Sequence, residues 1–133
     1  MSEPFRLNLL CALIGILLGF LSGLLFGLFF HRENWLGGYG SFKRRMYRLA
    51  HISFFGLGFV NLAFYFTARV LSPDAATISL ASKAFLVGAA TMPLCCILLA
   101  HRARALSIFT LPVGSLLLGG GLTIAQLLKV MGA

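Results

Sequence analysis

The sequence of 133 residues has few charged residues, and very few of these are acidic. Charged residues make up 11% of the chain, and only three residues are Asp or Glu. A soluble domain carries about a quarter charged residues, whereas this chain is 59% hydrophobic and has a mean hydropathy of +0.96. The composition therefore excludes a soluble globular domain and predicts an integral membrane protein.

Carboxylates are missing from the long apolar stretches, because Glu3, Glu33 and Asp74 all lie outside them. A transporter coupled to protons or cations ordinarily places a carboxylate within the membrane. Hydrolytic or transfer chemistry also needs an acid, a base and a nucleophile in one place. The positions of the acidic residues argue against both classes of function, and we expect no enzyme activity.

Cysteine is scarce as well, with Cys11, Cys95 and Cys96 the only three. Adjacent residues on a helix point about 100° apart, so Cys95 and Cys96 are poorly placed to chelate one ion. None of the three belongs to a C-x-x-C pair. We expect buried thiols that fill space between helices, and no structural disulfide.

Apolar runs, in contrast, are long and frequent. About 20 apolar residues cross a hydrocarbon core that is ~30 Å thick, and four segments of about this length or more are nearly free of charge. They cover about residues 7–30, 51–71, 78–100 and 106–130. We predict an all-α integral membrane protein, in which residues 1–133 form a single transmembrane domain, a bundle of four helices with short loops.

The net charge of +8 comes from basic residues that lie beside the ends of the predicted spans. Seven of the eleven lie in two loops, after the first span and after the third. These seven are Arg32, Lys43, Arg44, Arg45, Arg48, Arg102 and Arg104. By the positive-inside rule both loops face the cytoplasm, which puts both termini on the other side. The predicted location is a bacterial cytoplasmic membrane.

The segment GGYGSFKRRMYRLAH, between the first two spans, combines aromatic residues with a basic cluster. Such a mixture can bind RNA by stacking, but it is also typical of the membrane interface. We interpret Trp35, Tyr39, Phe42 and Tyr47 as interfacial anchors. We interpret the basic residues as contacts to anionic lipid headgroups, and expect no nucleic acid partner; they are Lys43, Arg44, Arg45 and Arg48.

In the first span glycine recurs at every fourth position, at Gly15, Gly19, Gly23 and Gly27. Each interior glycine weakens a helix by roughly 0.5–1 kcal/mol relative to alanine. In lipid, small residues at this spacing let two helix backbones approach closely. The pattern therefore predicts a packing stripe, whose partner is either another span of this chain or a helix of another protein.

The second span has one polar face, because its polar residues and one glycine fall within a sector of about 80°. These residues are His51, Gly58, Asn61, Tyr65 and Arg69. Asn61 lies near the predicted centre of the bilayer, where an unpaired amide is costly, so we expect it to point into the bundle. It either joins helices by a hydrogen bond or binds a ligand such as a quinone.

The short link between the second and third spans predicts which residues lie at equal depth. It pairs Asn61 with Thr91 and His51 with His101, and the first loop brings His31 to the level of His51. Imidazoles from facing helices can hold a metal ion or the iron of haem b. Histidines at helix ends also serve as caps and anchors, and none of the three belongs to a spaced metal motif.

These observations favour a non-catalytic small membrane subunit that packs into or stabilises a larger membrane complex, in an electron-transfer chain. Its expected partners are anionic lipids and other membrane subunits or further copies of itself. The alternative is an electron-transfer subunit that binds haem b or a metal through His51 and His101, with or without His31, and with Asn61 and Tyr65 beside the cofactor. A third reading is a small oligomeric channel or carrier.

Overall fold

The computed structural model describes residues 5–71, 74–102 and 106–132. Four long helices run through these ranges, with two short 3₁₀ helices in the connections and no strand in the described residues. They are α1 (Arg6–Phe29), η1 (Trp35–Gly37), α2 (Phe42–Leu71), α3 (Ala75–His101), η2 (Leu106–Phe109) and α4 (Thr110–Met131). All four long helices are long and apolar enough to cross a membrane. The predicted all-α, four-helix fold is confirmed.

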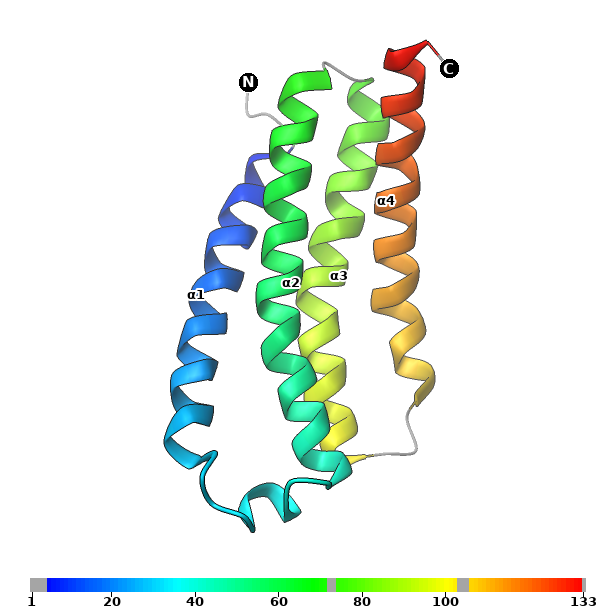
Figure 1. Cartoon of the computed structure of the whole chain (residues 1–133). Helices are drawn as coiled ribbons and strands as arrows, with labels where there is room; N and C mark the ends of the chain where they lie inside the picture. Colours follow the sequence, from blue (N-terminus) through cyan, green and yellow to red (C-terminus); the bar gives the residue numbers. More distant parts are fainter. Residues whose placement is uncertain (1–4, 72–73, 103–105, 133) are drawn as a thin grey trace.

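The helices run alternately up and down, with α2 and α3 between the two flanking helices α1 and α4 (Figure 1). Helix α1 packs mainly on α2, and α4 packs mainly on α3. In the most apolar part of each helix, 33% of α2 and 39% of α3 is buried, against 11% of α1 and 11% of α4. Most of the surface of both flanking helices is therefore left for lipid or for another helix.

Helix α2 begins at Phe42, well before the predicted start near residue 51. The backbone N–H of Arg44 donates to the hydroxyl oxygen of Ser41 at 3.1 Å, which satisfies one of the unpaired donors of the first turn. Lys43, Arg44, Arg45 and Arg48, which were predicted to lie in a loop, are therefore part of the helix. Their side chains point in directions set by the helical period.

Helix α3 also begins earlier than predicted, at Ala75 rather than near residue 78. Asp74 caps it: its Oδ2 accepts from the Thr77 hydroxyl at 2.8 Å and from the Thr77 backbone N–H at 3.0 Å. These two hydrogen bonds, the hydroxyl first, lower the pKa of Asp74 below its ordinary value. The cap shortens the turn between α2 and α3.

A shorter turn changes which residues of α2 and α3 face each other. His101 bonds to Tyr47, with 2.9 Å between its Nε2 and the phenol oxygen, and not to His51 one turn further along α2. Deeper in the bundle the rings of Phe64 and Phe85 pack with their centroids 5.0 Å apart. The predicted pairing of His51 with His101 is wrong by one helical turn.

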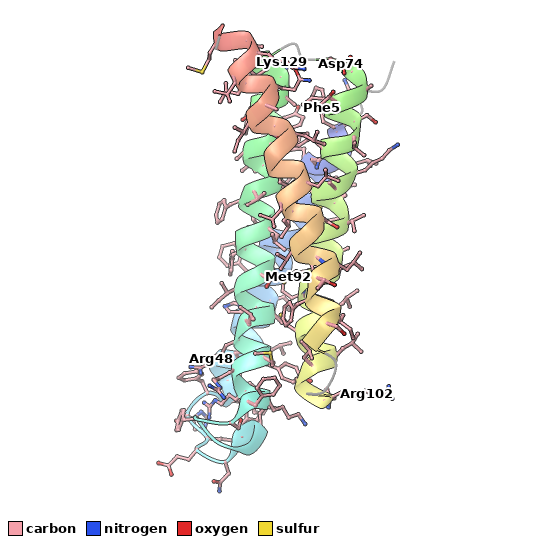
Figure 2. The ribbon with its side chains drawn as sticks, turned by 90° about the vertical axis from the view of Figure 1, so that its right-hand side faces the viewer. Phe5, Arg48, Asp74, Met92, Arg102 and Lys129 are labelled. Carbon is pink, nitrogen blue, oxygen red and sulfur yellow. The ribbon has the colours of Figure 1, made fainter. Side chains whose placement is uncertain are left out.

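A buried apolar cluster lies toward the end of the bundle where α1 begins. It consists of Phe5, Phe64, Tyr65, Ala68, Ile78, Ala81 and Phe85. Figure 2 shows Phe5 at this end, together with Asp74 and Lys129, while Arg48 and Arg102 lie at the opposite end. The apolar cluster therefore lies at the end of the molecule opposite Arg48 and Arg102.

Candidate functional site

The contact between α1 and α2 is closest where two glycines meet. A Cβ atom on Gly15 would lie 3.0 Å from the carbonyl oxygen of Phe54 and 3.4 Å from the Cα atom of Gly58. A Cβ atom on Gly58 would lie 3.1 Å from the carbonyl oxygen of Ala12. Only residues without a side chain allow backbones to approach this closely, so this part of the glycine stripe serves a contact within the chain.

Further along the stripe, Gly19 and Gly23 make room for rings of α2. A Cβ atom on Gly19 would lie 2.7 Å from the ring of Phe55, and one on Gly23 would lie 3.1 Å from Cε1 of His51. Gly27 differs, because nothing lies within 4 Å of its Cβ position. Three of the four glycines thus face α2, and the fourth borders open space.

Three buried polar side chains join α1, α2 and α3 at one level. The side-chain amide of Asn8 donates to Oδ1 of Asn61 at 2.7 Å and to the carbonyl oxygen of Ser82 at 3.3 Å. The Ser82 hydroxyl donates to Oδ1 of Asn8. Asn61 donates to the carbonyl oxygen of Leu57, 2.9 Å away in its own helix. Because these groups satisfy one another, the triad holds the helices together.

The partner predicted for Asn61, Thr91, lies elsewhere. Its hydroxyl donates to the carbonyl oxygen of Val87, 2.6 Å away within α3. The prediction was wrong because it considered only the link between α2 and α3, and the partner comes from α1. The sequence did contain a signal for Asn8, since Asn8, Gly15 and Gly19 recur at spacings of seven and four and so share one face of α1.

His51 is held in place by α1. Its Nδ1 atom lies 2.8 Å from the hydroxyl oxygen of Ser22, and that hydroxyl donates to the carbonyl oxygen of Gly19 at 3.1 Å. Which of the two groups donates depends on the tautomer of the ring, and in either case the contact joins α2 to α1. The ring also packs edge-on against Phe26 and Phe55, with centroids 5.5 and 5.6 Å away.

The structure does not bring the three histidines together. His51 bonds to α1 through Ser22, His101 bonds to Tyr47, and His31 is exposed in the connection after α1. Within the described ranges, no group of three or more His, Cys, Asp or Glu side chains is placed to hold a metal ion.

Tyr65, the other predicted cofactor contact, lies in the apolar cluster. Its ring packs against Phe5 with 5.8 Å between centroids, and its hydroxyl accepts from Arg69 at 3.4 Å. Three other residues of the predicted polar face, His51, Gly58 and Asn61, contact α1. The polar face of α2 therefore faces α1 along much of its length.

Arg44 does not contact lipid headgroups as predicted, because its side chain is only 1% exposed. Its guanidinium donates to the carbonyl oxygens of Phe30 at 2.8 Å and Arg32 at 3.3 Å. It also lies over the ring of Tyr39, 3.9 Å from the centroid, and within 5.4 Å of the Trp35 ring centroid. Carbonyls beyond the last turn of α1 lack helical partners and attract a cation, and the Ser41 cap turns Arg44 toward them.

The other three predicted headgroup contacts stay at the surface. Arg45 and Arg48 are exposed, and Lys43 is half-buried. Trp35 and Tyr39, predicted to anchor the chain in the interface, contribute their rings to the surroundings of Arg44. Of the four basic residues, Arg44 is thus buried within the chain, while the other three remain at the surface. The four residues do not share one environment.

A groove of about 510 Å³ lies between α1 and α3, with α2 as its floor. Small residues line part of it, including Gly15, Gly58, Ala89 and Ala90, and the remaining lining is almost entirely apolar. Its volume falls in the range of roughly 300–1,000 Å³ that is typical of small-molecule sites. With few polar groups in its wall, among them Ser53 and Cys11, the groove suits hydrocarbon.

A second, smaller hollow lies between the later half of α1 and the early half of α2. Its volume is about 260 Å³, and its wall contains one charged side chain. The lining residues are Gly23, Phe26, Gly27, Phe30, Arg48, His51 and Ile52. Gly27, the glycine of α1 with an open Cβ position, and Arg48, a cation of α2, therefore line the same hollow.

Comparison with known proteins adds no relative. No family model matches the chain, and neither a curated protein nor a solved structure matches it significantly.

Proposed function

We propose that this chain is a non-catalytic, multi-pass subunit of a bacterial cytoplasmic membrane that packs into or stabilises a larger membrane assembly through α4. The further proposal that this assembly belongs to an electron-transfer chain is an analogy from the four-span fold alone. The proposal rests on one observation, the contrast between the two kinds of glycine in α4.

The first kind of glycine forms the contact of α4 with α3. A Cβ atom on Gly119 would lie 3.1 Å from the ring of Phe85. On the α3 side, a Cβ atom on Gly88 would lie 2.5 Å from the side chain of Leu116. These glycines have a structural use within the chain, because each accepts a large side chain from the neighbouring helix.

The second kind has no such use. Gly114 and Gly121 are exposed, and nothing lies within 4 Å of either Cβ position. They are seven positions apart and so share one face of α4, on which Ala125 is also exposed. A glycine in lipid weakens its helix by about 0.5–1 kcal/mol, and close packing with another helix offsets that cost. This face therefore suits a transmembrane helix of another subunit or of a second copy.

The use of the buried polar groups also supports a non-catalytic role. Asn8, Asn61 and Ser82 bond to one another across three helices, and Arg44 bonds to carbonyl oxygens. In the described residues no buried side-chain nitrogen or oxygen lacks a hydrogen-bond partner. Groups that already satisfy one another add stability to the chain and are not free to bind a substrate.

The proposal is tested by substituting one open glycine of α4. In Gly121→Leu the added side chain should hold a partner helix away, so the large species seen by native electrophoresis of gently solubilised membranes should be lost. The amount of chain in the membrane should not change, since Gly121 touches nothing within the chain. Gly56→Leu is the matched control, because Gly56 is an open glycine on α2.

Two results would contradict this proposal. One is a wild-type chain that migrates only at the mass of a single copy, and the other is equal migration of the two leucine variants and the wild type. If the wild type migrates as a larger species, chemical cross-linking in the native membrane identifies the partner as a second copy or a different protein.

A further inference from the structure

The smaller hollow between α1 and α2 contains a cation that the chain itself does not neutralise. Arg48 is exposed at its edge and, among the described residues, makes no hydrogen bond, ion pair or ring contact. Of the other arginines of α2, Arg44 bonds to carbonyl oxygens and Arg69 bonds to the hydroxyl of Tyr65, while Arg45 is exposed outside the hollow. Arg48 is thus available to an anion from outside the chain.

No carboxylate of the described chain is placed to pair with Arg48. Asp74 lies at the opposite end of the molecule (Figure 2), and Glu33 makes no ion pair with Arg48. The hollow also contains His51, whose Nδ1 is engaged by Ser22. The lining of the hollow therefore includes a cation, Arg48, and no carboxylate. This arrangement favours a negatively charged occupant.

The rest of the hollow is apolar and owes its space to glycine. Gly23 and Gly27 form the α1 side, with Phe26 beside them, and Ile52 contributes from α2. Nothing in the chain lies within 4 Å of the Cβ position of Gly27, so this glycine is not needed for contact with α2. A cation at the edge of an apolar hollow matches a molecule with an anionic head and a hydrocarbon chain.

The depth of the hollow agrees with that chemistry. Arg48 lies at the same end of the bundle as Arg102, near the connection that follows α1 (Figure 2). Basic residues gather at this end, which by the positive-inside rule faces the cytoplasm, where anionic lipid is enriched. At such a position an arginine reaches the level of lipid phosphates, while the hollow below it reaches the hydrocarbon.

We propose that this hollow is a binding site for one anionic phospholipid, with Arg48 on the phosphate and the start of an acyl chain over Gly23 and Gly27. The site is independent of the α4 face proposed above. In this site Gly27, the fourth glycine of the α1 stripe, leaves room for the acyl chain, which is a role other than helix packing. Any side chain at position 27 would occupy the space of the lipid.

The experiment counts lipids on the purified whole chain by native mass spectrometry, in detergent, with phosphatidylglycerol or phosphatidylethanolamine added at equal concentrations. The wild type should retain one phosphatidylglycerol in preference to phosphatidylethanolamine. Arg48→Gln should weaken this binding about fivefold, the effect of one basic residue near a lipid surface. Arg45→Gln is the matched control, because it removes the same charge from an exposed position outside the hollow and should leave the binding unchanged.

A second pair of variants tests the hollow with the charge intact. Gly27→Leu should abolish retention of the lipid by filling the space, while Gly56→Leu, at an open glycine outside the hollow, should not. Circular dichroism and membrane yield show whether each variant is folded. If Gly27→Leu is not folded, the comparison of Arg48→Gln with Arg45→Gln tests the site by itself.

Three results would overturn the proposal. Equal weakening by Arg48→Gln and Arg45→Gln would mean a diffuse attraction of the basic surface for anionic lipid. Full retention of lipid by folded Gly27→Leu would remove the hollow from the interaction. Displacement of the lipid by millimolar inorganic phosphate would identify a simple anion contact with no role for the acyl chain. None of these results bears on the assembly measured for Gly121→Leu.

Discussion

At the scale of single residues, the buried polar side chains of the described residues are few, and Asn8, Asn61, Ser82 and Arg44 have defined partners. Asn8 is completely buried and links Asn61 and Ser82, so that α1 is tied to both central helices at one level. Arg44 ties the connection after α1 to the start of α2 without any carboxylate, through carbonyl oxygens and aromatic rings. In a membrane such contacts give the packing its register, because apolar side chains alone do not distinguish a neighbouring helix from lipid.

The hydrogen bond between Asn8 and Asn61 can be measured with a double-mutant cycle. We expect Asn61→Leu to lower the free energy of unfolding by about 1–2 kcal/mol, because interhelical hydrogen bonds in membranes are modest. The double variant Asn8→Leu/Asn61→Leu should cost less than the sum of the single variants by roughly 0.6–1.7 kcal/mol. Reversible unfolding in mixed micelles provides the measurement.

Thr91→Val is the control for this cycle, since Thr91 bonds only within its own helix. It should change the stability by no more than about 0.5 kcal/mol. Strict additivity of Asn8→Leu and Asn61→Leu would show that the two amides are not coupled, contrary to the observed geometry.

At the scale of elements, α1 depends on α2 for its place in the bundle. The stripe of Gly15, Gly19 and Gly23 accepts the backbone at Gly58 and the rings of Phe55 and His51 in turn. Helix α1 is otherwise mostly exposed, with 11% of its most apolar part buried. The position of α1 is therefore sensitive to volume along one face and tolerant of change on the others.

We expect Gly19→Leu to separate α1 from α2, because its Cβ atom alone would lie 2.7 Å from the ring of Phe55. Overpacking of this kind costs about 1–3 kcal/mol. Leu18→Ile, next to it on the helix, conserves volume and should cost less than about 1.5 kcal/mol. The melting temperature of the purified chain and its yield in membranes are the measurements.

The same series contains an internal test of the stripe. Gly27→Leu should be milder for stability than Gly19→Leu, since no part of the chain lies near the Cβ position of Gly27. If Gly19→Leu, Gly27→Leu and Leu18→Ile all melted alike, the stripe would have no part in packing α1 on α2.

At the scale of the whole molecule, four antiparallel helices bring the start of α1 and the end of α4 to the same end of the bundle (Figure 1). Arg48 and Arg102 lie at the opposite end (Figure 2). The positive-inside rule predicts that this end faces the cytoplasm.

We therefore expect tags at both termini to be labelled from the periplasmic side of intact spheroplasts. Protection of both tags would reverse the orientation, and labelling of only one would be incompatible with four spans. A cytoplasmic marker protein that stays unlabelled provides the control for intact membranes.

The sequence by itself determined the four helices, their apolar character and the faces they use. These properties depend on local composition and on the helical period, because a chain in lipid must satisfy its backbone hydrogen bonds within each helix. The stripe at Gly15, Gly19 and Gly23 and the polar face through His51 and Asn61 could both be recognised from spacing. That the two faces meet each other was left open by the sequence and was decided by the fold.

Only the tertiary structure decided which residues are partners. The caps at Ser41 and Asp74 start α2 and α3 earlier than the apolar runs suggest, and the turn between α2 and α3 is correspondingly short. A shift of one turn moves a side chain by about 5.4 Å along the axis, which exceeds the length of any hydrogen bond. Contacts across helices therefore depend on register to within one residue, whereas the presence of a membrane span and its orientation do not. The shift in register is the reason that His101 contacts Tyr47.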